Sequence, residues 1–281
     1  MIYWIINALI LSIWWVLYKK SLVIMNWIIS DKFYQLIGAF FTILFSSVLY
    51  IYYDLEQVNI YIFIMLIATA FLWIIWELFE QYAYKNERLS VLVPYWEFQS
   101  VFTVIFWFLF FTDNSIISLF FTLLAWLTLV IWSINLKKIS FNKYCLALIV
   151  KSLFSTFKIL LYWFILKSLA IYNVVFYNIL IVFFILLLVS IFNREIKKIK
   201  KINIRKYKYL FLENFVRFFI WLLSLFIISE LWIVQAVLIW MMYMVTSLIS
   251  ASLFLKEKIS KKEIIIALVV SLCIWCWVLL W

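Results

Sequence analysis

The chain is poor in several residue types, and each scarcity excludes a class of protein. It has no histidine, so it lacks the commonest metal ligand and the side chain that most often carries protons near neutral pH. Charged residues make up only 13% of the sequence and hydrophobic residues 69%, whereas a soluble globular protein is about a quarter charged. A water-soluble fold cannot cover this much apolar side chain, so we exclude one.

Cysteine is also rare, and its positions argue against a secreted disulfide scaffold. Cys145, Cys273 and Cys276 all lie within apolar stretches. The last two have CxxC spacing, but no histidine or acidic residue lies near them, so we favour small apolar helix residues over a metal or redox site. The N-terminus lacks the basic region and cleavage site of a signal peptide, so its apolar block is expected to remain as a helix.

Polar residues divide the chain into apolar blocks long enough to cross a bilayer, which takes roughly 20 residues per helix. Blocks such as IFIMLIATAFLWIIW are apolar on all sides, which favours helices over the alternating polarity of β-barrel strands. We therefore predict an all-α membrane protein with ten transmembrane helices. Their expected ranges are 2–17, 33–53, 60–81, 90–111, 115–134, 144–166, 169–192, 209–229, 231–255 and 263–281.

Lysine and arginine alternate between the connectors and so predict an orientation. The connectors after the first, third, fifth, seventh and ninth predicted helices, here called the odd connectors, hold 20 of the 24 Lys and Arg residues. The intervening, even connectors hold one, Lys167. Because cytoplasmic loops retain positive charge, we expect the odd connectors in the cytoplasm and both termini outside.

The net charge of +11 does not indicate a nucleic-acid partner, because the basic residues sit in short connectors. The longest of these, NREIKKIKKINIRKYK at 193–208, has the composition of a patch for anionic lipid or nucleic acid. We favour the alternative, a solvated loop that sets the topology.

The two sets of five segments resemble each other weakly. Residues 101–132 and 245–277 each have an apolar helix, a very short polar connector and a closing apolar helix. Because five is odd, the second set enters the membrane in the opposite sense. We predict two inverted five-helix repeats, residues 1–137 and 138–281, an arrangement common in secondary transporters.

On these residues the sequence resembles the EamA-like members of the drug/metabolite transporter superfamily. The resemblance is carried by SVLVPYWEFQSVFTVIFWFLFF in the first half and SLFLKEKISKKEIIIALVV in the second, with Pro94 matching a proline early in the family's fourth helix. It implies a transporter whose first, third, fourth, sixth, eighth and ninth helices surround a central cavity. It also implies cytoplasmic termini, opposite to what the loop charges predict.

The chain departs from that family in its single glycine, Gly38, and single proline, where family members use many. Close helix packing must therefore use other small residues. Ser247 and Ala251, with Thr246 and Ser250 beside them, give the ninth predicted helix one such face.

Charged residues inside the predicted helices are the best evidence for a site, because a charge near the bilayer centre costs about 2.5 to 3.5 kcal/mol and usually faces a cavity. All of them fall on helices that surround the cavity in the family. The candidate cavity residues are Glu77, Glu97, Lys151, Lys158, Glu213 and Arg217.

Spacing refines these candidates. Lys151 and Lys158 are seven residues apart and share a helical face, while Glu213 and Arg217 can pair along one helix. A structural salt bridge is the alternative role for that pair.

Glu97 lies one turn after Pro94, whose missing N–H predicts a local helix irregularity beside a buried acid. For Glu77 the alternative is snorkelling from the helix end to the interface, and for Glu80, the remaining intramembrane acid, snorkelling is the favoured role. Four aromatic residues on inner helices are candidates to stack on a substrate, with lipid-facing packing as the favoured alternative: Trp96, Trp107, Trp163 and Tyr243.

These observations lead us to expect a secondary-active transporter, an exporter of small organic metabolites or amphipathic compounds that works by alternating access. Four buried acids against three buried bases favour a zwitterionic or polar neutral substrate. The alternative is a channel-like or non-transporting membrane subunit. A membrane-embedded enzyme is less favoured, because the sequence has no His, DxD or DDxxD motif, and we predict no catalytic residue, metal or cofactor.

The expected location is the plasma (inner) membrane, crossed many times. The expected partners are the lipid bilayer, a small-molecule substrate and a proton as the candidate coupling ion, with Glu97 as its candidate carrier. The sequence gives no oligomeric state.

Overall fold

A computed structural model describes residues 2–25, 31–50, 53–96, 98–110, 142–193, 204–230 and 243–261, with residues 120, 124, 264–265, 268–269 and 272. The regular secondary structure of these residues is entirely α-helical. The helices are α1 (Ile2–Met25), α2 (Asp31–Leu49), α3 (Ile60–Asn86), α4 (Leu89–Trp96), α5 (Phe98–Phe110), α7 (Lys143–Leu166), α8 (Ile171–Phe192), α9 (Ile204–Glu230) and α11 (Tyr243–Leu255).

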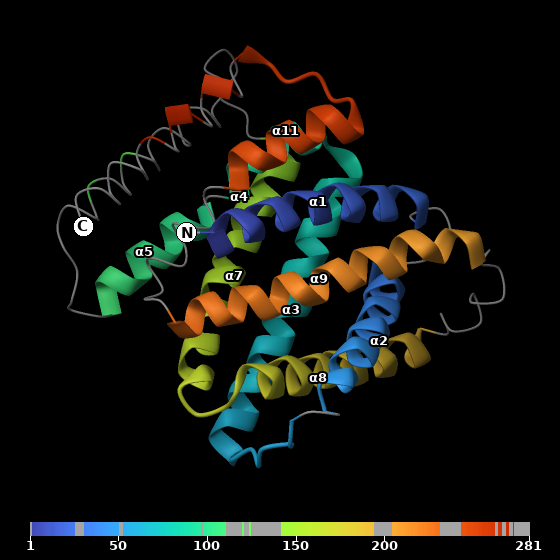
Figure 1. Cartoon of the computed structure of the whole chain (residues 1–281), viewed down its shortest axis with the longest axis vertical. Helices are drawn as coiled ribbons and strands as arrows, with labels where there is room; N and C mark the ends of the chain where they lie inside the picture. Colours follow the sequence, from blue (N-terminus) through green and yellow to red (C-terminus); the bar gives the residue numbers. More distant parts are fainter. Residues whose placement is uncertain are drawn as a thin grey trace.

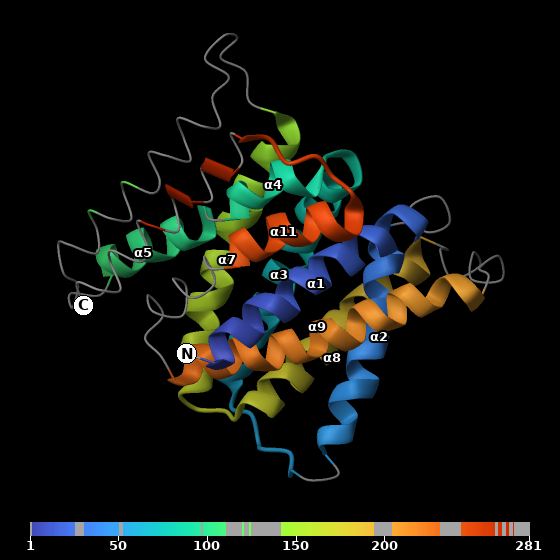
Figure 2. The same cartoon turned by 45° about the horizontal axis from the view of Figure 1, so that its top comes forward.

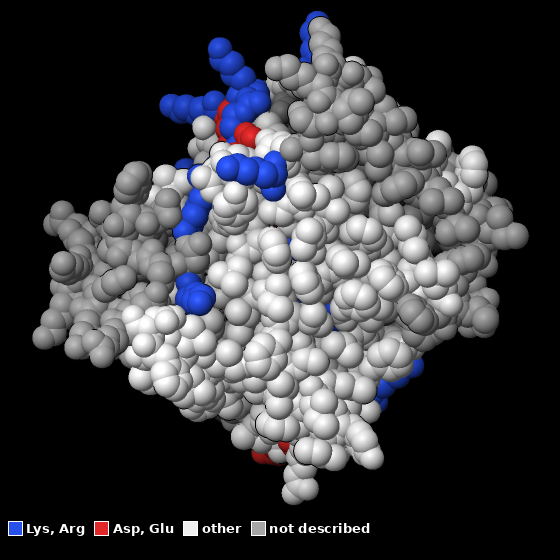
Figure 3. Space-filling model, turned by 180° about the vertical axis from the view of Figure 1, so that it is seen from behind, with Lys and Arg blue, Asp and Glu red and all other residues white. Residues whose placement is uncertain are grey.

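Five of these helices are long and apolar enough to cross a membrane. The spans are Lys32–Leu49 in α2, Ile60–Asn86 in α3, Lys143–Leu166 in α7, Ile171–Phe192 in α8 and Lys208–Glu230 in α9. Large apolar side chains on them face outward, among them Phe63, Phe157, Phe184 and Phe219. In Figure 3 the middle of the described surface carries almost no charge, and lysine and arginine gather toward its edges. The protein is therefore a multi-pass, membrane-embedded helical bundle.

Three predicted helices match the structure closely at 60–81, 144–166 and 169–192, in α3, α7 and α8. The predicted helix 90–111 corresponds to α4 and α5, on either side of residue 97, which lies outside the described residues. The described residues also leave out most of the predicted helices 115–134 and 263–281, the first part of 231–255, and most of the basic connector 193–208.

Two helices continue beyond their predicted ends, α1 to Met25 and α3 to Asn86. The predictions stopped where polar residues begin. In the structure the residues just beyond these predicted ends lie inside the bundle: Tyr18 donates a hydrogen bond to Glu77 at 2.7 Å, and Tyr84 is fully buried. Polarity therefore marked an internal contact and not the end of a span.

The largest helix contacts join residues 1–137 to residues 138–281. In these contacts α3 packs on α7, α2 on α8, and α1 on both α9 and α11. Figures 1 and 2 show α1 and α9 side by side, with α11 along the opposite flank of α1. The two segments interlock, so a space between them is bounded by both.

Residues from four of the predicted odd connectors meet at one end of the bundle. Glu257, which follows α11, accepts hydrogen bonds from the backbone N–H groups of Leu89 and Ser90 at 3.0 and 2.9 Å. Its carboxylate lies 3.2 Å from Lys19 Nζ. We call this contact, between the end of α11, the start of α4 and α1, the Glu257 junction. Beside it, the Asn142 amide donates to Glu87 at 2.8 Å.

Two even connectors meet through a separate set of contacts. The backbone N–H of Ala170 donates to the Glu56 carboxylate at 3.0 Å, and the Tyr177 hydroxyl donates to the Glu56 carbonyl at 2.8 Å. In these contacts the four odd connectors and the two even connectors form separate groups, which agrees with the alternation of the loop charges, while the predicted orientation stays a prediction.

Small residues allow close approach of α1 and α11. Ser247 and Ala251 are fully buried, and the Ser250 hydroxyl donates to the Ser12 hydroxyl at 3.2 Å. The predicted small face of this helix is confirmed for these residues. The single glycine serves another contact: a Cβ on Gly38 in α2 would lie 2.8 Å from the Asn214 side-chain oxygen in α9.

Candidate functional site

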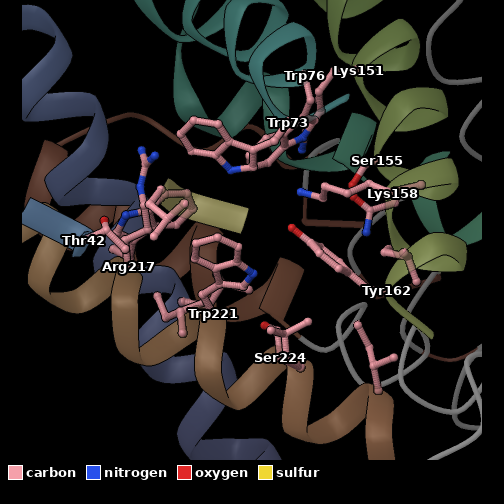
Figure 4. A pocket seen from close by; sticks show the side chains of 18 of the residues that line it. Thr42, Trp73, Trp76, Lys151, Ser155, Lys158, Tyr162, Arg217, Trp221 and Ser224 are labelled. Carbon is pink, nitrogen blue, oxygen red and sulfur yellow. The ribbon is translucent and has the colours of Figure 1, made fainter. Parts of the chain in front are cut away.

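A cavity of about 160 Å³ lies between the two segments, and we call it the central cavity. Figure 4 shows Lys158 and Tyr162 projecting into it from α7, opposite Arg217 and Trp221 of α9. Its walls combine bulky aromatic rings with three basic side chains. The lining residues come from α1 (Leu11, Trp14, Trp15), α2 (Gly38, Thr42), α3 (Trp73, Trp76), α5 (Gln99), α7 (Lys151, Ser155, Lys158, Ile159, Tyr162), α8 (Ile179) and α9 (Arg217, Ile220, Trp221, Ser224, Leu225, Ile228).

Arg217 is the centre of a buried ion cluster on one wall. Its Nε donates to Glu213 one turn earlier in α9 at 2.8 Å, and its NH2 group donates to Glu77 of α3 at 3.0 Å. Both carboxylates are fully buried. Trp14 donates to Glu213 at 2.8 Å and Tyr18 donates to Glu77 at 2.7 Å. One guanidinium therefore ties α3 to α9, with α1 supplying two further donors.

Lys151 forms a second, separate ion pair. Its Nζ lies 2.9 Å from a Glu80 carboxylate oxygen, and both side chains are almost completely buried. The same ammonium lies 5.1 Å from the centre of the Trp76 ring, close enough for a cation–π contact. This pair holds α7 against α3 beside the cavity.

Lys158 differs from the other two bases. Its Nζ lies 3.8 Å from the centre of the Trp76 ring, and it forms no ion pair with any carboxylate among the described residues. Three further polar side chains on the wall, Gln99, Ser155 and Ser224, form no hydrogen bond with another described residue. The central cavity therefore offers a cation and several polar groups that the described part of the protein does not use.

The structure brings five of the six predicted cavity residues together. Lys151, Lys158 and Arg217 line the cavity, and Glu77 and Glu213 lie directly behind Arg217. The predicted pairing within α9 and the shared face of the two lysines are confirmed.

Two other expectations have different outcomes. The snorkelling alternative for Glu77 and Glu80 is wrong, because both side chains are fully buried and each contacts a cation of another helix. Glu97 lies outside the described residues, so the irregularity predicted between it and Pro94 stays a prediction.

The helices around the cavity are not quite those implied by the family resemblance. The second and seventh helices contribute through Gly38, Thr42 and Ile179 of α2 and α8, whereas no described residue of α11 lines the cavity. The reason is that α2 packs against both α8 and α9, and the absence of a Cβ on Gly38 brings it close to α9.

Three of the four predicted aromatic candidates pack elsewhere. Trp96 stacks on Trp15 with ring centres 4.1 Å apart, and Trp107 meets Trp163 edge-on at 5.1 Å. None of Trp96, Trp107 and Trp163 lines the cavity. The Tyr243 side chain lies outside the described residues.

Several of the lining aromatic and polar residues that sequence reasoning missed had a usable signal. Each lies four residues from a buried charge and therefore on the same helical face. Trp73 precedes Glu77, Tyr162 follows Lys158, Trp221 follows Arg217, and Ser155 follows Lys151 at this spacing. A search one turn from each intramembrane charge would have found them.

Comparisons with known proteins assign no family. No protein-family model matches the sequence. No curated protein matches it significantly. The resemblance to EamA-like transporters thus rests on the segments quoted above, and function has to be argued from the cavity itself. Within the part of the chain that the structure describes, no three potential metal ligands come together.

Proposed function

We propose that the protein is a secondary transporter, an exporter in the plasma membrane that moves a small organic compound by alternating access. The observation that carries this proposal is the central cavity. It lies inside an apolar membrane bundle, is lined from both sequence halves, and contains charged side chains that cost several kcal/mol to place in a membrane. Intramembrane charges of this kind mark substrate pathways.

The pattern of helix contacts supports an inverted repeat of ten spans. An axis that exchanges the halves would exchange α1 with α7, α2 with α8, α3 with α9, and the α4–α5 region with α11. The contact of α3 with α7 would then become that of α9 with α1, and the contact of α2 with α9 would become that of α8 with α3. All four contacts occur, and the self-related pairs α2–α8 and α4–α11 also pack together. Such repeats rock against each other in transporters.

A membrane-embedded channel or a non-transporting subunit is the competing function. A buried aromatic layer favours a carrier: Trp15, which lines the cavity, stacks on Tyr84 and Trp96 with ring centres 5.0 and 4.1 Å apart, and all three rings are buried. An alternating-access carrier needs one side closed while the other is open.

The test is a thermal-shift screen of the detergent-purified protein against a metabolite library, followed by counterflow in proteoliposomes for each hit. A bound ligand at 100 times its Kd stabilises the folded state by about 2.7 kcal/mol. A carrier should show saturable uptake that unlabelled compound inside the vesicles accelerates. Flux that rises linearly with concentration would indicate a channel, and ligand binding without flux would indicate a non-transporting subunit.

A further inference from the structure

The described charged side chains that line the central cavity all have one sign. Lys151, Lys158 and Arg217 line it, whereas no described acidic residue does. The carboxylates of Glu77 and Glu213 lie behind the Arg217 guanidinium, which donates to both. The wall is therefore basic although the buried charges as a set are balanced.

Two of the three bases already have carboxylate partners. Arg217 is shared between two of them, and Lys151 pairs with Glu80 at 2.9 Å. The Lys158 ammonium lies against the face of the Trp76 ring and pairs with no described carboxylate. An unpaired charge inside a membrane protein is costly. A ligand with one negative charge would therefore bind favourably, because it would supply the ion-pair partner that Lys158 lacks among the described residues.

The rest of the wall fits a flat apolar group. The rings of Trp73, Trp76 and Trp221 border the cavity, and Figure 4 shows Trp73 and Trp221 on two sides of the space into which Lys158 points. The volume of about 160 Å³ is close to that of an engineered apolar cavity of about 150 Å³ that binds benzene. A compound with one aromatic ring and a short side chain that ends in an acidic group therefore has a size that fits the cavity.

We propose that the central cavity binds a small aromatic monocarboxylate, with the carboxylate on Lys158 and Ser155 and the ring between Trp73 and Trp221. Its role as the transported substrate rests on the proposed function. A single negative charge is specified because only one of the lining bases lacks a described carboxylate. An added amino group is disfavoured because no described carboxylate faces the cavity to receive it.

This conclusion differs from the zwitterionic or neutral substrate that the sequence favoured. A count of buried acids and bases treats all of them as equally available to a ligand. The structure turns three acids away from the cavity and directs three bases toward it.

The first experiment measures equilibrium binding by calorimetry to the purified protein in detergent. The probes are phenylacetate, 2-phenylethanol, phenethylamine and phenylalanine, which share one ring and differ in charge. We expect phenylacetate to bind most tightly, and Lys158→Gln to weaken it at least about tenfold. Lys158→Arg, which keeps the charge, should bind within a few-fold of the original protein. Lys143→Gln is the matched control, since Lys143 is exposed at the start of the same helix.

Tighter binding of phenylalanine, phenethylamine or the alcohol would overturn the proposal, as would equal phenylacetate affinity in the Lys158→Gln variant. Thermal unfolding without ligand verifies that each variant is folded. Counterflow of labelled phenylacetate then separates the two conclusions. Lys158-dependent binding without flux leaves the site intact and refutes the transporter, whereas flux of other compounds without phenylacetate binding refutes the substrate class alone.

Discussion

Lys151 and Glu80 show how single residues carry charge within this bundle. Their side chains are nearly inaccessible, and they meet at 2.9 Å across the contact of α3 with α7. Such a pair affects the stability of the fold mainly when one of its two partners is replaced. Removing one partner leaves the other as an uncompensated buried charge, whereas removing both charges leaves no uncompensated charge.

We therefore predict that Lys151→Met alone lowers the free energy of unfolding by about 3 to 5 kcal/mol. The double variant Lys151→Met with Glu80→Gln should recover most of that loss. Denaturant unfolding in detergent micelles, followed by tryptophan fluorescence, measures both. If the double variant is as unstable as the single one, the pair contributes more than mutual neutralisation.

Some of the site was predictable at the level of residues and some was not. The Glu213–Arg217 pair depends on spacing within one helix, so the sequence contained it. The ion-pair partners of Glu77 and Glu80 come from α9 and α7, more than 70 positions away in the chain, and spacing gives no information about such contacts. For the same reason the sequence favoured snorkelling for Glu80, because a charge on an isolated helix has a lower free energy at the interface than inside the membrane.

At the scale of elements, the Glu257 junction is the contact that fixes α11 to α4 and α1. The chain turns sharply after α11, where Lys256 adopts a φ of 56°, and this returns Glu257 to the first two backbone N–H groups of α4. A carboxylate is favourable there because the N-terminal end of a helix carries partial positive charge. Burial alone would raise the pKa of Glu257, but the N–H groups of Ser90 and Leu89 and the Lys19 ammonium hold it below its ordinary value.

The stabilisation that Glu257 provides depends on pH. Because the folded-state pKa is lower than that of the unfolded chain, ionised Glu257 stabilises the fold in full above the ordinary glutamate pKa of about 4.3, and this contribution is lost as the pH falls through the lowered value. We predict that Glu257→Gln lowers the free energy of unfolding by about 1 kcal/mol at pH 7. The difference from the unaltered protein should shrink as the pH approaches about 3.

Melting temperatures recorded across this pH range test the prediction. Glu230→Gln is a suitable control, since Glu230 is exposed at the end of α9. A difference that stays constant down to acid pH would show that the Glu257 charge is not what stabilises the junction.

At the scale of the whole molecule, the separate gathering of odd and even connectors predicts the membrane topology. Four single cysteine substitutions test this topology, and each replaces an exposed residue and leaves the loop charges unchanged. Two lie near the odd connectors, at Asn86 and Ser260, and two near the even connectors, at Gln57 and Ser168. In a background without Cys145, Cys273 and Cys276, an impermeant maleimide added to intact cells should label Gln57→Cys and Ser168→Cys. The other two should react only after the membrane is opened.

Labelling of Asn86→Cys and Ser260→Cys on opposite sides would rule out the inverted repeat. Labelling of both from outside would preserve the repeat and reverse the orientation that the loop charges predict. In that case the termini would be cytoplasmic, as the family resemblance implies.

The balance of the described buried charges determines how the membrane voltage would act on a bound anion. The six described intramembrane charges are three acids and three bases, Glu77, Glu80 and Glu213 against Lys151, Lys158 and Arg217, so these six charges sum to zero. A monoanion bound among these six side chains would then add one net negative charge. Because one charge moved across 100 mV is worth about 2.3 kcal/mol, the ordinary inside-negative membrane voltage would by itself drive such an anion outward, roughly 50-fold against its concentration gradient. Efflux through this protein would need no coupling ion.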